Sequence, residues 1–178
     1  NQRTYSLDTL PLEYAAEGIG DFRVAAVAVT HGNGGNALDL RYESHRVYRG
    51  KEGIPGLPYV YAGDADVETL EIVLKDTAGE VRVALRYGVF EKLDVVTRSA
   101  VIENCGPGPK MLTKAHTVCI DMPWGDWEWV HFHGRHTMER QVQRLPLLSG
   151  IQESSSKRGA SSHQQNPTVL LCEKDCTE

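Results

Sequence analysis

The chain has 178 residues, of which 40% are hydrophobic and 24% charged, and this composition is ordinary for a globular protein. Its 19 basic and 24 acidic residues give a formal charge of −5, and no basic block extends beyond residues 156–158, so the phosphate-neutralising face that nucleic acid binding requires is excluded. No apolar run approaches the ~20 residues of a membrane-spanning helix, and we expect neither nucleic acid nor a membrane as a partner.

The first predicted elements are extended segments. Residues 22–30 (FRVAAVAVT) and 38–48 (LDLRYESHRVY) flank the turn-forming sequence HGNGGNA, and this arrangement predicts a pair of strands. Residues 67–74 (VETLEIVL) place their leucines and isoleucine on one face of an extended chain, as expected for a strand with one buried face.

The clearest strand pattern lies at residues 80–90 (EVRVALRYGVF). Arg82 and Arg86 alternate with apolar residues, which predicts a half-buried antiparallel strand with its arginines facing outward. The side chains predicted to face inward are those of Val81, Val83, Leu85, Tyr87 and Val89.

The next two segments, residues 93–104 and 110–121, again contain β-branched runs. The sequence CGPGP (105–109) separates them, and its prolines and glycines break any regular ladder of hydrogen bonds. We predict that the two segments form a hairpin with an open loop.

Further strands are predicted at residues 127–133 (WEWVHFH) and 167–172 (PTVLLC). The one helix-like stretch, the polar run at 138–144, is short and lacks capping residues. Regular strands without long helices predict a mainly β, antiparallel fold, either a sandwich or a barrel.

Two histidines in the window 125–139 suggest a metal site. His131 and His133 point to the same face of an extended segment, and with Gly125 and Glu139 they approximate the first cupin motif, in which two histidines and a carboxylate hold a metal. The spacing from His133 to Glu139 is longer than that motif allows, and no second motif follows. Histidines in ordinary strand or loop positions are the alternative interpretation.

The same window holds all three tryptophans, Trp124, Trp127 and Trp129. On an extended segment, Trp127 and Trp129 share a face with His131 and His133, and indole rings beside polar groups suit the stacking and edge hydrogen bonds that a sugar ring needs. Burial of the tryptophans in the core is the alternative expectation.

The cysteines are too few for a disulfide scaffold, and we expect reduced thiols. Cys172 and Cys176 form the one close pair, and a lone C-x₃-C motif lacks the two further ligands that zinc requires. No phosphate-binding loop or dinucleotide fingerprint occurs. We therefore expect no metal and no cofactor.

A set of strings in order along the chain resembles the N-terminal domain of the α-galactosidases of glycoside hydrolase family 36. The most specific of them is RGASSHQQNP. The strings are SLDTLPLEY (6–14), GDFR (20–23), DLRYESHRVYRGK (39–51), GLPYVY (56–61), ETLEIVLKD (68–76), DVVTRSAVIEN (94–104), RLPLLSGIQ (144–152) and KRGASSHQQNP (157–167).

The resemblance implies that residues 1–178 are part of an antiparallel β-supersandwich, incomplete here, that precedes a catalytic (β/α)₈ barrel. The family removes terminal α-galactosyl residues from melibiose and raffinose-type oligosaccharides with retention of configuration. Its two catalytic aspartates belong to the barrel, so we expect no catalytic residue in this chain. The implied partners are α-galactosides, the enzyme's own barrel and other subunits of a homo-oligomer.

The resemblance also implies one substrate-binding residue. In the family a loop that reads G-A-W, followed by a run like R-E-R, lines the sugar pocket with its tryptophan. The matching stretch here is GRHTMER (134–140), in which Arg135 and His136 replace the alanine and tryptophan. We expect His136 to approach the sugar. An imidazole offers less apolar area than an indole but donates or accepts a hydrogen bond.

The Ser-rich stretch at residues 154–167 is typical of a flexible linker by composition alone. Because it contains the most specific family string, we expect an ordered loop of structural rather than catalytic role. We expect Arg158 to bind carbonyl or carboxylate oxygens and Gly159 to adopt a positive φ. The side chains expected to satisfy turn backbone are those of Ser161, Ser162, His163 and Asn166.

Two other functional classes stay open at this point. One is a stand-alone carbohydrate-binding or assembly module without a hydrolase, and the other is a cupin-like metal protein. The first residues show no targeting signal, and we expect a cytoplasmic protein.

Overall fold

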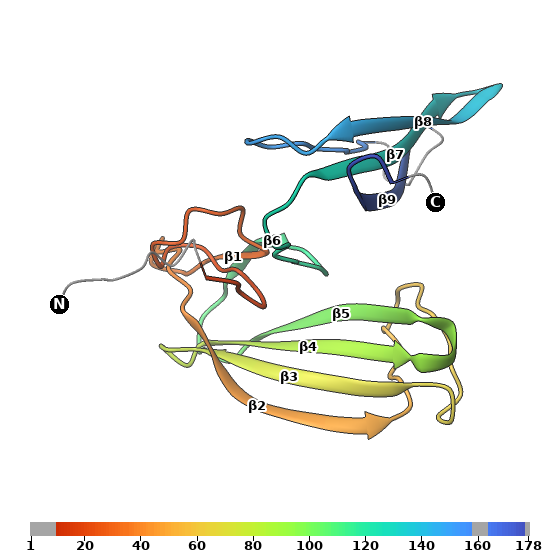
Figure 1. Ribbon diagram of the computed structural model, residues 1–178. Coiled ribbons are helices and arrows are strands. Elements are labelled where there is room, and N and C mark those ends of the chain that lie inside the picture. Colours follow the sequence, from red (N-terminus) through yellow and green to blue (C-terminus); the bar gives the residue numbers. More distant parts are fainter. Residues whose placement is uncertain (1–9, 158–163, 177–178) are drawn as a thin grey trace. The chain divides into compact units, whose positions relative to one another are not determined.

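The computed structural model describes residues 10–157 and 164–176. The chain divides into two compact units, Asn1–Asp121 (unit 1) and Met122–Glu178 (unit 2). Nearly all regular structure in the described ranges is antiparallel strand, so the predicted mainly β, antiparallel class is confirmed (Figure 1). No helix in these ranges is long and apolar enough to cross a membrane.

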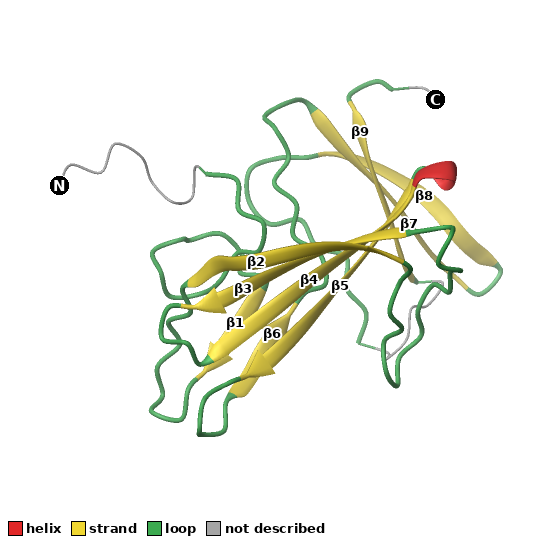
Figure 2. Ribbon diagram, turned by 90° about the horizontal axis from the view of Figure 1, so that it is seen from below, coloured by secondary structure: helices red, strands yellow, loops and turns green. Residues whose placement is uncertain are grey.

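The described part of unit 1 contains two sheets. The larger has the order β2-β3-β4-β5, and β1 pairs with β6 in the smaller one. Figure 2 shows β2 to β5 side by side, with β1 and β6 lying across one face. The bounds are β1 Val27–Thr30, β2 Leu40–Arg49, β3 Glu68–Asp76, β4 Val81–Phe90, the 3₁₀ turn η2 Glu91–Leu93, β5 Val95–Asn104 and β6 Met111–Ala115.

The core of unit 1 lies between these sheets and follows the alternation predicted for β4. Val83 and Leu85 are fully buried, whereas Arg82 and Arg86 lie on the opposite face and pair with carboxylates. Leu74 on β3 belongs to the same cluster. The buried members are Tyr14, Ala16, Ala26, Val27, Val29, Leu38, Leu74, Val81, Val83 and Leu85.

At the end of β4 the predicted pattern is wrong for Val89, which is 43% exposed, while Gly88 and Phe90 are buried. The segment after β2 covers the opposite face of the sheet here. A Cβ atom on Gly88 would lie 3.3 Å from side-chain atoms of both Lys51 and Val67. At the end of β4 the buried side chains are therefore those on the other face of the strand, because the long connection after β2 packs there.

Two predicted strand pairings are also wrong. Residues 22–30 and 38–48 do not pair with each other, because β1 pairs with β6 and β2 with β3. Residues 93–104 and 110–121 do not form a hairpin, because β5 pairs with β4. The connection after β5 donates two backbone hydrogen bonds to the carbonyl of Glu80. The chain then leaves the larger sheet and enters the sheet that contains β1.

Unit 2 is a three-stranded sheet of order β8-β7-β9. The strands are β7 Trp127–Arg135, β8 Met138–Pro146 and β9 Gln165–Glu173. The helix-like character expected at residues 138–144 is wrong, since this stretch forms most of β8. Its polar composition fits an edge strand whose side chains are largely exposed, and its backbone pairs with β7.

Candidate functional site

The predicted site residue His136 lies at the tip of the β7–β8 hairpin. The register shifts between His133 and Arg135, and Arg135 pairs with Met138, which leaves His136 and Thr137 as the two-residue turn. Thr137 has a φ of 67°, and its backbone N–H donates to Glu139 Oε1 at 2.8 Å.

The hairpin requires glycine at position 134. A Cβ atom there would clash with the carbonyl oxygen of Met138 on the facing strand, so any side chain would force the backbone to shift. This close approach positions the tip, and His136 is exposed on it. Within residues 10–157 and 164–176, no hydrogen bond or ion pair holds its imidazole.

His131 and His133 lie on one face of β7 with Trp129, as predicted. The ring centroids of Trp129 and His131 are 5.3 Å apart, and those of His131 and His133 are 6.2 Å apart. His133 Nδ1 is bonded to the carbonyl of Gln141 at 3.1 Å, and its Nε2 lies 3.3 Å from Gln143 Nε2.

The described residues contain no group of three or more His, Cys, Asp or Glu side chains that could hold a metal. Glu139, the expected carboxylate ligand of the cupin-like hypothesis, accepts the backbone N–H of Thr137 at the hairpin tip. The arrangement around His131 is thus an aromatic row along one strand.

The three tryptophans differ in environment. Trp124 is 101% exposed, so the expectation that all three belong to a core is wrong. The indole N–H of Trp127 donates to the carbonyl of Pro123 at 2.9 Å. Trp129 is half-buried, and its Nε1 is a buried atom without a partner among the described residues.

The Ser-rich stretch is described only at its ends. Ser154 Oγ donates to Gln165 Oε1 at 2.7 Å, and Asn166 Oδ1 accepts the backbone N–H of Thr168 at 2.9 Å, which confirms the backbone role expected for Asn166. The other residues named for this stretch lie outside the described residues: Arg158, Gly159, Ser161, Ser162 and His163.

One cluster that was not predicted from the sequence is formed by His31, Glu80 and Lys110. These residues come from three separate connections of unit 1 and meet around one carboxylate oxygen, Glu80 Oε2. The turn-forming sequences HGNGGNA and CGPGP indicate that loops lie at two of these positions. They do not indicate that the loops come together in the folded chain.

Comparison with known proteins places the chain in a family. The model of the glycosyl hydrolase family 36 N-terminal domain matches residues 1–178. The α-galactosidase AgaA of Geobacillus stearothermophilus is 45% identical over 179 residues, which cover 100% of this chain and 25% of that protein.

Similar solved structures agree with this family match. A variant of AgaA in complex with raffinose superposes with a TM-score of 0.94 at 46% identity, covering 98% of this chain and 24% of that one. The galactosidase domain of the α-galactosidase–sucrose kinase AgaSK, an enzyme of Mediterraneibacter gnavus, gives a TM-score of 0.93 at 45% identity, covering 99% of this chain and 24% of that one.

The chain therefore belongs to the N-terminal domain family of the family 36 α-galactosidases. It spans about a quarter of the length of these two enzymes' matched chains. Membership in this family rules out the cupin-like identity.

Proposed function

We propose that the chain is the non-catalytic N-terminal domain of a retaining α-galactosidase that removes terminal α-galactosyl residues from melibiose and raffinose-type oligosaccharides. The observation that carries the proposal is the family match over residues 1–178, together with 46% identity to an enzyme solved with raffinose. Retaining hydrolysis uses two carboxyl groups about 5 Å apart, one as nucleophile and one as acid and base. In this proposal both belong to a barrel domain outside the chain.

The domain's first role is to pack against that barrel and against other subunits. Apolar side chains on unit 1 support this role, because Val96, Val118 and Ile120 are 61%, 51% and 68% exposed. They line a cavity of about 590 Å³ together with Tyr87 and Arg98. Apolar side chains that gather on a surface in this way mark a site of contact with another body.

Unit 2 offers further apolar side chains for the same role. Val142, Leu148 and Ile151 are 63%, 67% and 80% exposed, although each is a residue type that prefers the interior. Contact with the barrel or a neighbouring subunit would remove this area from water.

The domain's second role is to supply one side of the sugar pocket through His136. The turn at residues 136–137 projects from two paired strands, and the imidazole is exposed and free of hydrogen bonds within the described ranges. An exposed imidazole on a rigid hairpin is available to donate to or accept from a sugar hydroxyl.

The test of this role is the substitution His136→Trp in the α-galactosidase that contains this chain. An indole adds a stacking plane, so we expect kcat/KM for melibiose and raffinose to change about 2- to 10-fold, in proportion to the worth of an aromatic contact. The measurement is the initial hydrolysis rate of both sugars over a range of concentrations.

The matched control is His116→Trp, because His116 is also exposed but lies in unit 1. We expect this variant to keep the kinetic constants of the wild type. An unchanged kcat/KM for both sugars in His136→Trp would show that His136 does not contact substrate.

A second candidate function is a stand-alone carbohydrate-binding module, and the full exposure of Trp124 favours it, since an exposed indole is a stacking surface for a sugar ring. A titration of the 178-residue chain with melibiose, monitored by tryptophan fluorescence, distinguishes the two candidate functions. Saturable binding that is lost in Trp124→Ala would favour the module.

A further inference from the structure

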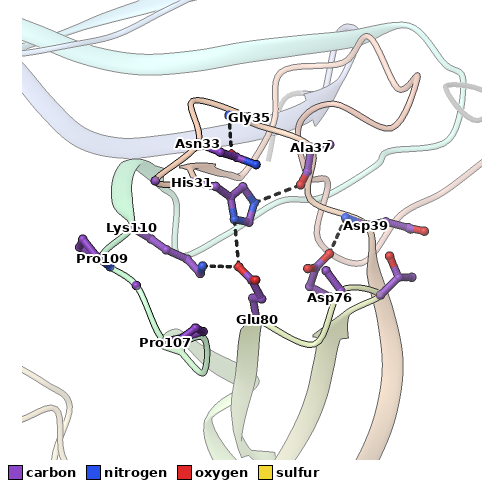
Figure 3. A pocket seen from close by; sticks show the side chains of 14 residues that line it. His31, Asn33, Gly35, Ala37, Asp39, Asp76, Glu80, Pro107, Pro109 and Lys110 are labelled. Atoms are coloured by element: carbon purple, nitrogen blue, oxygen red, sulfur yellow. Dashed lines mark hydrogen bonds and ion pairs between the residues drawn. The ribbon is translucent and has the colours of Figure 1, made fainter.

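Two pockets of unit 1 differ in whether their lysine has a carboxylate partner. The first pocket lies among the connections that follow β1, β3 and β5 (Figure 3). There Lys110 Nζ and His31 Nδ1 both meet one carboxylate oxygen of Glu80. These contacts tie the three connections together, and the charge of Lys110 is compensated within the chain.

The second pocket lies beneath the connection between β2 and β3, on the face of the larger sheet opposite the core. Residues within 51–60 of that connection line it together with residues of β3, β4 and β5. Its volume is about 290 Å³, close to the lower end of the range of small-molecule sites. Ile54, Pro58 and Val60 give it an apolar wall.

Two arginines and two glutamates beside the second pocket neutralise one another. Glu52 Oε2 pairs with Arg86 at 2.9 Å, and its Oε1 pairs with Arg46 at 3.3 Å. Both oxygens of Glu71 are held by the same two arginines, at 2.8 and 2.7 Å. This network therefore carries no net charge, and each of its carboxylate oxygens already has a partner.

Lys51 adds a positive charge that this network does not compensate. In residues 10–157 and 164–176, no carboxylate forms an ion pair with it, whereas Arg98, another lining residue, pairs with Glu13 at 3.2 Å. The Lys51 ammonium donates to the carbonyl oxygen of Val60 at 3.2 Å and lies 5.3 Å from the ring centroid of Tyr59. Both of these residues line the pocket, so the ammonium lies at its wall. An ammonium has three N–H donors, and Lys51 is partly exposed.

A second donor is provided by Ser99 on β5. Ser99 is paired with Arg86 on β4, so the two side chains lie on the same face of the sheet, and both residues line the pocket. The hydroxyl of Ser99 has no hydrogen-bond partner in the part of the chain that the structure describes. Its oxygen is accessible, since it is not one of the buried side-chain atoms that lack a partner. A ligand in the pocket can therefore reach it.

We propose that this pocket binds a small organic carboxylate. The carboxylate accepts hydrogen bonds from the Lys51 ammonium and the Ser99 hydroxyl, and its carbon skeleton lies against Ile54 and Pro58. A neutral ligand would accept the same hydrogen bonds but leave the charge of Lys51 uncompensated, whereas a carboxylate also forms the stronger, charge-assisted bond. One surplus positive charge matches one carboxylate.

The first test compares benzoate with benzyl alcohol, which has the same ring but no charge. Each is titrated into the 178-residue chain near neutral pH and followed through the NMR signals of the backbone N–H groups. We expect benzoate to bind about tenfold or more tightly than benzyl alcohol, because hydrogen bonds between charged groups are the stronger ones. The signals of Gly88 and Ser99, which line the pocket, should shift. Absence of benzoate binding, or equal affinity of the two compounds, would overturn the proposal.

The second test uses variants of the two donors. Lys51→Met removes the charge and keeps an unbranched side chain, and we expect it to weaken benzoate binding about tenfold. Ser99→Ala should weaken it about threefold or more. The control is Lys92→Met, which changes the net charge equally but lies on η2, outside the pocket, and should leave the affinity unchanged. Wild-type affinity in Lys51→Met, or equal weakening in both lysine variants, would contradict a site at Lys51.

Discussion

The two units of the chain bury apolar surface to very different extents. Unit 1 places ten buried residues in one cluster between two sheets. In the described part of unit 2, Val130 and His131 alone are buried, at 7% and 8% exposure. A three-stranded sheet needs a hydrophobic face or packing against other structure for independent stability. Unit 1 therefore contributes most of the buried apolar surface in the described residues, and we expect unit 2 to gain stability from contacts outside its own sheet.

The largest expected effect is that of Leu85→Ala. Leu85 is fully buried in the cluster of unit 1, and its truncation should lower the free energy of unfolding by about 2–5 kcal/mol through lost burial and a cavity. Leu170→Ala is the comparison in unit 2, where the side chain is 46% exposed, and should cost below about 1 kcal/mol. Urea unfolding of both variants followed by circular dichroism measures the difference. Equal losses would contradict the asymmetry between the units.

An intermediate effect is expected for Glu71→Gln. Glu71 lies on β3 between Arg46 on β2 and Arg86 on β4, with N–O distances of 2.8 and 2.7 Å, and it is 7% exposed. Removing its charge weakens both hydrogen bonds, and we expect a loss of about 1–3 kcal/mol near neutral pH. The free energy of unfolding in urea measures the loss.

The cost of Glu71→Gln should depend on pH. The hydrogen bonds from Arg46, and then from Arg86, lower the pKa of the Glu71 carboxyl group in the folded chain. Its stabilising contribution is therefore fully present above the unfolded pKa of about 4.3 and is lost as the pH falls through the lower folded pKa. The difference between wild type and variant should shrink with acidification. A difference that stays constant down to acid unfolding would contradict this explanation.

A smaller effect on stability than that of Glu71→Gln is expected for Gly134→Ala in unit 2. The added methyl group would meet the Met138 carbonyl, so the β7–β8 tip must open, at a cost of about 1 kcal/mol. Faster amide hydrogen exchange confined to the hairpin is the measurement. Gly108→Ala is the control, since nothing lies within 4 Å of a Cβ atom there. Exchange rates that match the control would show that the tip tolerates a side chain.

The strands of the larger sheet could be predicted because they have one buried face. In β4 the apolar and charged residues alternate through Leu85, and this pattern follows directly from side chains that point to opposite faces. The pattern fails at Val89 because a connection remote in sequence covers the other face. The sequence of strand β8 does not predict a strand, because both faces of the strand are largely exposed and its residues show no alternation of apolar and polar side chains.

Strand pairing and the pockets of unit 1 could not be predicted from the sequence. Alternation within a strand indicates which face is buried, but it does not identify the neighbouring strand. The pairing of β1 with β6 therefore does not follow from their sequences. His31, Glu80 and Lys110 are far apart in the chain, and only the folded connections bring them together. The resemblance to the family is what points to His136, and the contact of His136 with a sugar stays a prediction.

We propose that this chain is one domain of an α-galactosidase, and we expect it to have no hydrolase activity of its own. The most direct measurement is the hydrolysis of p-nitrophenyl α-galactoside by the purified chain, with its mass of 19.7 kDa verified, beside the longer enzyme that contains it. We predict turnover by the longer enzyme and none by the chain. Turnover by the 19.7 kDa chain itself would contradict the account, because it would place the catalytic carboxylates within these residues.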